Sequence, residues 1–128
     1  HVGVNNHMGS RGTANRELMT TILTELKRRN LFFLDSYTTP DSTGNSVGRK
    51  IKIPILTRGV FLDNEDSKPA IRAQLNEVRK LAREKGNAIA IGHYRPKTLE
   101  VLKEEIPKFG KEGFEIISLK QMLKIQRD

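Results

Sequence analysis

Val2-Gly3-Val4-Asn5-Asn6-His7-Met8-Gly9-Ser10 is the stretch of this sequence that decides its fold. Its apolar, β-branched start, Val2-Gly3-Val4, predicts a short buried strand. The polar residues that follow, with two amides, an imidazole and a hydroxyl, favour a turn. A buried strand that ends in a polar loop is how α/β folds build their sites. The alternative is that the Asn residues cap a turn and His7 is an ordinary surface or partly buried histidine.

The rest of the chain repeats this pattern of strand and helix about five times. Such alternation predicts an α/β fold with a parallel sheet and right-handed crossovers, either open and doubly wound or part of a barrel. The other predicted strands are Leu31–Leu34, Ile53–Leu56, Ala88–Ile91 and Phe114–Ile117. Residues 41–52 have the length of a short helix but carry residues that weaken one, and Val60 to Asn64 reads as a loop anchored by Phe61 and Leu62.

Cap residues predict where the helices begin and end. Pro107 is expected to bend or end the helix that it lies in. The predicted start residues are Thr13, Ser67 and Ser118, the last in a capping box with Gln121. The predicted end residues are Asn30, Gly86, Gly110 and Gly113.

Length and composition limit the classes of function. The 128 residues suffice for one domain with a core, and no apolar run approaches the roughly 20 residues of a membrane span. The absence of cysteine excludes disulfides, thiol nucleophiles and cysteine-ligated zinc. A net charge of +8 suits an anionic partner. The basic residues are spread, however, and two Tyr without Trp offer little for base stacking, so nucleic acid is not the expected partner.

The start of the chain predicts that more polypeptide precedes it. It does not begin with Met and opens almost inside a strand. We therefore expect residues 1–128 to be a single domain piece of a longer polypeptide.

Polar side chains follow several of the predicted strands. Because the carboxyl ends of parallel strands meet at one edge, these side chains can converge on one site. Two His and one Asp suit zinc or another divalent ion, and a remaining His or Asp could act as general acid or base. Two unrelated histidines would show the same spacing, and Asp63 is interpreted as a cap of the following helix. The converging residues are Asn5, Asn6, His7, Asp35, Ser36 and His93.

Four stretches resemble, in order, the signatures of the divergent polysaccharide deacetylases. No Gly-x-Gly-x-x-Gly, Walker-type loop or Gly-x-Ser-x-Gly elbow supports a dinucleotide, NTPase or α/β-hydrolase alternative. The four stretches are residues 3–11 (GVNNHMGSR), 33–40 (FLDSYTTP), 60–64 (VFLDN) and 90–93 (AIGH).

The resemblance implies parallel βα units forming part of an irregular (β/α) barrel of the polysaccharide deacetylase type. It also implies metal-assisted hydrolysis of acetyl groups on a cell-envelope glycan, with zinc as the expected divalent metal and a periplasmic or extracellular location. By order along the chain, His93 matches a late general acid that also stands as a candidate metal ligand. Asp35 matches the acidic residue that orients it, and His7 is a metal-ligand candidate. The implied substrate-binding residues are Asn5, Asn6, Ser36 and Asp63.

Two departures from the family pattern shape the alternatives. The early Asp pair and a further His signature are not in this sequence, so the N-terminal half of the same domain is an expected partner. Tyr94 and Arg95 also separate Gly92-His93 from Pro96, where the family pattern places proline directly after the histidine. A glycan-binding or envelope-partner-binding module without turnover is therefore the alternative function. An anion-binding α/β domain driven by the positive charge is the third hypothesis.

Overall fold

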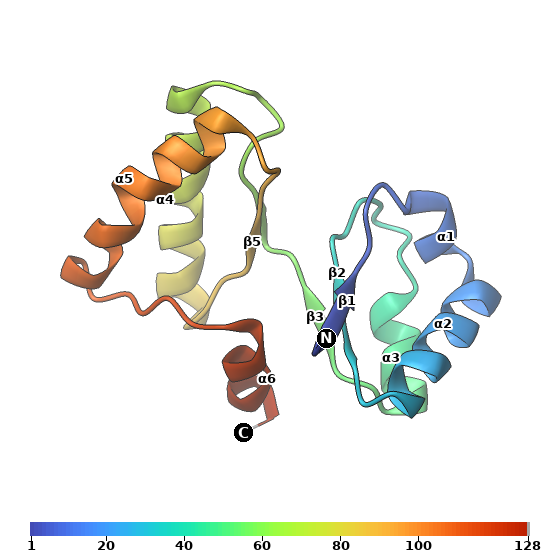
Figure 1. Ribbon diagram of the computed structural model, residues 1–128. Helices are drawn as coiled ribbons and strands as arrows, with labels where there is room; N and C mark the ends of the chain where they lie inside the picture. The colour runs from blue at the N-terminus through green and yellow to red at the C-terminus, as the bar shows by residue number, and fades with distance from the viewer. Residues whose placement is uncertain (128) are drawn as a thin grey trace. The chain divides into compact units, whose positions relative to one another are not determined.

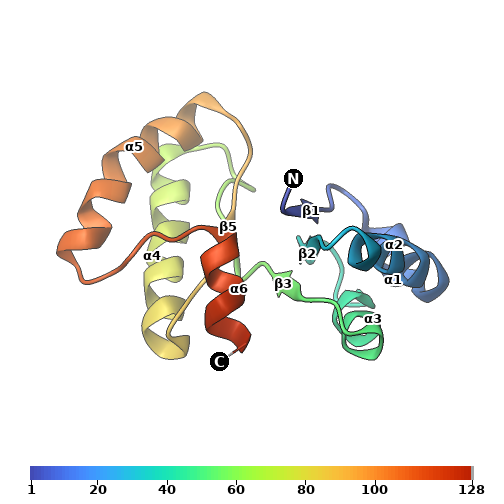
Figure 2. The same cartoon turned by 60° about the horizontal axis from the view of Figure 1, so that its bottom comes forward.

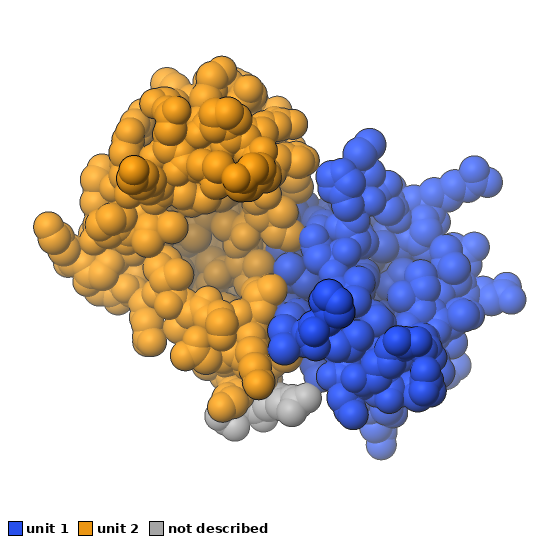
Figure 3. All heavy atoms as spheres, viewed as in Figure 1, with its two compact units in different colours: residues 1–58, 127 blue, residues 59–126, 128 orange. Residues whose placement is uncertain are grey.

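The computed structural model describes residues 1–127 and divides them into two compact units. Unit 1 contains residues 1–58 together with Arg127, and unit 2 contains residues 59–126 (Figure 3). Both units are built from parallel strands and helices, so the predicted α/β class is confirmed. Each unit has its own sheet and core, and each is described separately.

Unit 1 is a three-stranded parallel sheet in the order β1-β2-β3, with helices between its strands (Figure 1). Its strands share one direction, so their carboxyl ends lie at one edge of this sheet. The strands are β1 (Gly3–Asn5), β2 (Phe32–Asp35) and β3 (Ile55–Thr57). The helices are α1 (Ser10–Ala14), α2 (Arg16–Arg28) and α3 (Gly44–Ile51).

The core of unit 1 forms between α2, α3 and the middle strand. All four residues of β2 are buried, as expected for a strand with neighbours on both sides. The predicted cap Thr13 is wrong. Asn15 caps α2 by accepting a 3.0 Å hydrogen bond from the Leu18 amide, because Thr13 is buried within the separate short helix α1. The buried core residues are Met19, Leu23, Leu26, Phe33, Val47 and Ile53.

β1 is not the buried strand that its apolar sequence predicts. It lies at the edge of its sheet, next to β2. Val2 and Val4 are exposed, because an edge strand has a neighbouring strand on one side rather than two.

Unit 2 contains two short parallel strands and three helices. Ser67 caps α4, Gly86 ends it with a φ of 81°, and Ser118 and Gln121 form the capping box of α6, all as predicted. The predicted loop at Val60-Phe61 is instead a strand, because its backbone pairs with β5. The elements are β4 (Val60–Phe61), α4 (Lys68–Lys85), β5 (Ala90–Ile91), α5 (Pro96–Lys111) and α6 (Leu119–Arg127).

Helix α5 continues through Pro107 and Gly110, where the sequence predicted a bend or an end. Glu105 and Phe109, on either side of the proline, are buried, and both contact Arg79 of α4. This packing holds the helix together across the proline. Gly113 ends it, with a φ of 85°. The Phe114 amide donates to the Phe109 carbonyl at 2.9 Å, and the two rings pack with centroids 5.6 Å apart. This is a Schellman closure.

The strand predicted at Phe114–Ile117 is absent from the described residues of unit 2. Residues 114–118 carry no regular secondary structure. Phe114 closes α5 instead of starting a strand, so its apolar ring is used against the helix.

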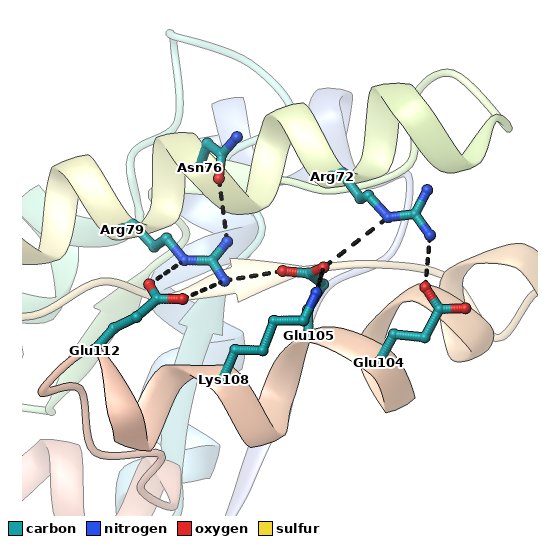
Figure 4. Close-up of polar contacts among 7 residues, drawn as sticks. All are labelled: Arg72, Asn76, Arg79, Glu104, Glu105, Lys108 and Glu112. Atoms are coloured by element: carbon teal, nitrogen blue, oxygen red, sulfur yellow. Dashed lines mark hydrogen bonds and ion pairs between the residues drawn. The ribbon is translucent and has the colours of Figure 1, made fainter.

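Arg79 joins α4 to α5, which lie side by side in Figures 1 and 2. Its buried guanidinium contacts Glu105 at 2.9 Å and Glu112 at 2.7 Å (Figure 4). It also lies 4.3 Å from the centre of the Phe109 ring. The hydrogen bonds that Arg79 donates to Glu112 and Glu105 raise its pKa despite its burial. Hydrogen bonds from Lys108 and Arg79 lower the pKa of Glu105. The paired charges therefore stay ionised between the two helices.

None of the helices within residues 1–127 is long and apolar enough to cross a membrane.

Candidate functional site

Unit 2 places Asp63 and His93 side by side. Phe61 and Ile91 are partners in the parallel register of β4 and β5, and the two polar residues follow two positions later on each strand. His93 Nδ1 lies 2.8 Å from Asp63 Oδ1, and the His93 amide donates to Asp63 Oδ2 at 2.8 Å. The strand ends therefore fix both the backbone and the ring of His93 against one carboxylate.

A hydroxyl completes the surroundings of this carboxylate. Thr98, in the first turn of α5, donates to Asp63 Oδ2 at 2.7 Å. Arg95 donates to the backbone carbonyl of Asp63 at 3.1 Å. Both Asp63 and Thr98 are buried. The hydroxyl from α5 therefore lies inside a site whose other residues follow two strands.

The hydrogen bonds of Asp63 keep it ionised in spite of its burial. Burial raises the pKa of this carboxyl, but hydrogen bonds from Thr98 and from the His93 ring and amide outweigh it. The pKa of Asp63 is therefore below its ordinary value.

The Asp63–His93 pair has the chemistry of a proton-transfer site. A carboxylate at Nδ1 favours the tautomer with its proton on that nitrogen, and Nε2 is then the atom that exchanges protons or binds a metal. The His93 side chain is 35% exposed, whereas Asp63 is fully buried. The Phe61 ring packs against the imidazole with centroids 5.4 Å apart. One partner is thus held rigidly and the other is within reach of a ligand.

A cavity of about 890 Å³ in unit 2 has His93 and Thr98 in its wall. Most of the remaining wall is apolar and comes from α4, α5, α6 and the segment that follows α5. Its volume is within the range of ligand-binding pockets. Apolar lining residues include Leu62, Leu99, Leu102, Ile106 and Met122.

In unit 1 the predicted substrate-binding residues Asn5, Asn6 and Ser36 come together. Asn5 Nδ2 donates to Ser36 Oγ at 2.7 Å, and Ser36 Oγ donates to the Asn6 carbonyl at 2.7 Å. Asn6 Oδ1 accepts from the Ser36 amide at 2.7 Å. The Nδ2 atom of Asn6 is buried and has no acceptor within the described residues. The ends of β1 and β2 are thus joined by one network with an unsatisfied donor.

Asp35, at the end of β2, is fully buried and uses both carboxylate oxygens inside unit 1. Oδ1 accepts from the Tyr37 amide at 2.8 Å, and Oδ2 accepts from Ser42 Oγ at 2.5 Å. The first residue of α3, Gly44, is close: a Cβ there would lie 2.9 Å from Asp35 Oδ2. This carboxylate shapes the loop between β2 and α3.

Sequence reasoning missed the partners of these aspartates. The interpretation of Asp63 as a helix cap is wrong, because Ser67 caps α4 and Asp63 contacts His93. Thr98 carried a usable signal, a hydroxyl in the first turn of the helix after a polar strand end. The expectation that Asp35 orients His93 stays a prediction, and Asp63 is the carboxylate in contact with the ring.

The expected meeting of His7 with His93 also stays a prediction. His7 is exposed in the loop after β1 of unit 1, and His93 belongs to unit 2. Over residues 1–127, no three His, Asp or Glu side chains are grouped as metal ligands would be.

Parallel βα units with polar groups at the strand ends define an α/β protein with a candidate site built on a buried aspartate and a partly exposed histidine. Residues 1–123 match the sequence profile of the family described as divergent polysaccharide deacetylase. The chain belongs to this family.

Three relatives illustrate the similarity. An uncharacterized protein of Haemophilus influenzae is 42% identical over 101 residues, which are 79% of this chain and 36% of the relative. The uncharacterized protein YibQ of Escherichia coli is 40% identical over 105 residues, 82% of this chain and 33% of the relative. The crystal structure of the uncharacterized protein ATU2773 of Agrobacterium tumefaciens superposes with a TM-score of 0.93 at 24% identity, covering 95% of this chain and 50% of that one. The chain thus spans about a third of the length of the two curated relatives.

Proposed function

We propose that the chain is part of a hydrolase that removes acetyl groups from a cell-envelope polysaccharide. The observation that carries this proposal is the Asp63–His93 pair, in a chain of the divergent polysaccharide deacetylase family. The proposal places the protein in the periplasm or outside the cell, where such a substrate is found. The cavity beside His93 supplies space for part of a ligand.

His93 is the proposed general acid. When water adds to the acetyl carbonyl and the bond to the sugar nitrogen or oxygen breaks, the leaving atom needs a proton, which His93 Nε2 donates. Asp63 holds the ring in position and stabilises the imidazolium before this transfer. Thr98 and the His93 amide keep the Asp63 carboxylate in place.

The strand ends of unit 1 are the proposed substrate contacts. Amide and hydroxyl groups of Asn5, Asn6 and Ser36 form hydrogen bonds of the kind that sugar hydroxyl and acetamido groups make. Asp35 supports these contacts through the loop that it shapes. Asp63 is fully buried, so its proposed effect on substrate binding is indirect, through the imidazole that it orients.

A divalent metal, with zinc as first choice, is also proposed. His7 and His93 are the candidate ligands of this chain, since imidazole is a common zinc ligand. For His93 this role is an alternative to that of general acid, because an Nε2 atom that binds zinc carries no proton to donate. Because the described residues group no complete set of ligands, the remaining ligands would come from the N-terminal half of the domain that the family pattern includes.

Deacetylation by the full-length protein tests the proposal. Acetate release from an acetylated glycan and zinc content are measured for the wild type, His93→Ala and the control His1→Ala. We expect zinc and turnover in the wild type and the control, and a loss of turnover of about 10²–10⁴-fold in His93→Ala. Full activity of His93→Ala would contradict the mechanism, and so would a full-length protein that binds no metal.

A binding module on the same fold is the second candidate. It is favoured by the departure of this sequence from the family pattern, in which Tyr94 and Arg95 separate Gly92-His93 from Pro96. This function predicts that the full-length protein binds the glycan after treatment with a chelator and releases no acetate at any metal concentration. Acetate release that disappears with the chelator would exclude it.

A further inference from the structure

Tyr37 adopts an uncommon backbone conformation at the end of β2. Its φ is 50°, in the left-handed region where a side chain is crowded by its own backbone. Glycine adopts this conformation without cost, and asparagine adopts it more readily than aromatic residues do. If this turn only had to reverse the direction of the chain, glycine or asparagine would form it with less backbone strain.

The surrounding structure holds this conformation with several hydrogen bonds. The buried Asp35 carboxylate accepts from the Tyr37 amide. Arg58 donates from Nε to the Ser36 carbonyl at 2.6 Å and from Nη2 to the Tyr37 carbonyl at 2.8 Å. Backbone strain fixed from both sides in this way is typical of functional sites.

The held conformation presents the ring of Tyr37 to solvent. The residue is 41% exposed and does not belong to the hydrophobic core cluster of unit 1. Strain that is kept at a position outside the core therefore does not serve core packing.

The neighbouring loop after β1 has the same features. Met8 has a φ of 50° and is 82% exposed. Ser10 Oγ lies within hydrogen-bonding distance of Thr38 Oγ1, at 3.0 Å, and of the Thr38 carbonyl, at 3.2 Å, which ties this loop to the one that carries Tyr37. An exposed aromatic ring and a flexible thioether thus stand on connected loops, close in sequence to the polar network of Asn6 and Ser36.

We propose that Tyr37 is a stacking platform for one pyranose ring of the glycan, with Met8 as an adaptable neighbour. The C–H groups on one face of a pyranose carry partial positive charge and pack on the negative face of an aromatic ring. The hydroxyl and acetamido groups at the rim of the sugar then meet Asn5, Asn6 and Ser36. This inference rests on the proposed carbohydrate function and adds a specificity-determining contact to it.

Calorimetric titration of the full-length protein with a chitin tetrasaccharide tests the platform. Tyr37→Asn removes the ring but suits the left-handed backbone, so we expect unchanged thermal stability and affinity about tenfold weaker. Tyr37→Phe keeps the ring and should bind within about twofold of the wild type. The control is Ile22→Gln, which removes an exposed apolar side chain from α2 of the same unit and should leave affinity unchanged.

Each result has a distinct meaning. Wild-type affinity in Tyr37→Asn, an equal loss in Ile22→Gln, or no binding by the wild type would overturn the platform. Binding that depends on Tyr37 without acetate release would support the platform and remove the deacetylase function. Acetate release with the same KM in the wild type and Tyr37→Asn would support the deacetylase function and contradict the platform.

Discussion

The two units use a buried aspartate at a strand end in different ways. Asp35 of unit 1 and Asp63 of unit 2 are both fully buried, and each accepts hydrogen bonds from a backbone amide and from a hydroxyl. The hydrogen bonds of Asp35 hold the loop that carries Tyr37. Asp63 has an additional partner, the ring of His93.

This difference shows how the same local chemistry can build a loop or orient a proton carrier. What distinguishes the sites is the residue that the neighbouring strand end supplies: β5 supplies an imidazole to Asp63, whereas Ser42 and a backbone amide complete Asp35. We therefore propose that the unit 2 aspartate serves catalysis and that the unit 1 loop contacts the substrate.

The largest expected effect is on turnover. Asp63→Asn should lower kcat/KM of the full-length protein by about 10²–10⁴-fold, because the amide no longer stabilises the imidazolium of His93. Asp35→Asn is the matched control and should act mainly on KM. A loss of kcat in Asp35→Asn as large as that in Asp63→Asn would instead favour Asp35 as the acid that orients His93.

The next effect is on the stability of unit 2. Arg79→Met should lower the free energy of unfolding by about 3 kcal/mol, because Glu105 stays buried without the Arg79 guanidinium. The remaining contact of Glu105 with Lys108 limits this loss. Denaturation followed by NMR signals of each unit measures the effect. Lys68→Met, which removes an exposed ion pair with Glu100 between the same two helices, should cost much less. Equal losses in the two variants would show that the buried network does not fasten α4 to α5.

A smaller effect is expected when Asp35 itself is altered. Asp35→Asn replaces an oxygen acceptor with a donor next to Ser42 or the Tyr37 amide, and should destabilise unit 1 by about 1–3 kcal/mol. Thermal unfolding measures this change. Asp41→Asn, an exposed substitution in the same loop, is the control. Unchanged stability in Asp35→Asn would mean that the loop does not depend on its carboxylate.

The smallest expected effect is a difference in acid sensitivity. The pKa of Asp63 is lower in the folded state, so its contribution to stability is complete above the unfolded value of about 3.9. It is lost as the pH falls further, through the folded pKa, because the unfolded chain then binds the proton more readily. Urea unfolding at pH 6 and pH 3 should show a smaller pH dependence in Asp63→Asn than in the wild type. An identical dependence would contradict the role given to its hydrogen bonds.

The alternation of strand and helix could be read from the sequence because it depends on local patterns. Ser67 and Gly86 bound α4 as predicted, since capping requires side chains and φ angles that few residue types supply. The strand predicted at Phe114–Ile117 was wrong because these apolar residues fit either a strand or a helix closure. Packing of Phe114 on Phe109 favours the closure. Pro107 remained inside α5 for a similar reason: buried neighbours outweighed the local cost.

The site was partly predictable. Polar residues at strand ends identified Asn5, Asn6 and Ser36, which the parallel register of β1 and β2 then joined. The partner of His93 was harder, because several aspartates follow strands and the sequence does not say which strands are neighbours. The pairing of β4 with β5 selects Asp63.

A double-mutant cycle on Asp63 and His93 tests the central claim most directly. kcat/KM for acetate release by the full-length protein is measured for the wild type, Asp63→Asn, His93→Gln and the double variant. If Asp63 acts through His93, the double variant is about as slow as His93→Gln alone, because removing the imidazole leaves the carboxylate nothing to orient. Losses that multiply in the double variant would show independent roles and contradict the account.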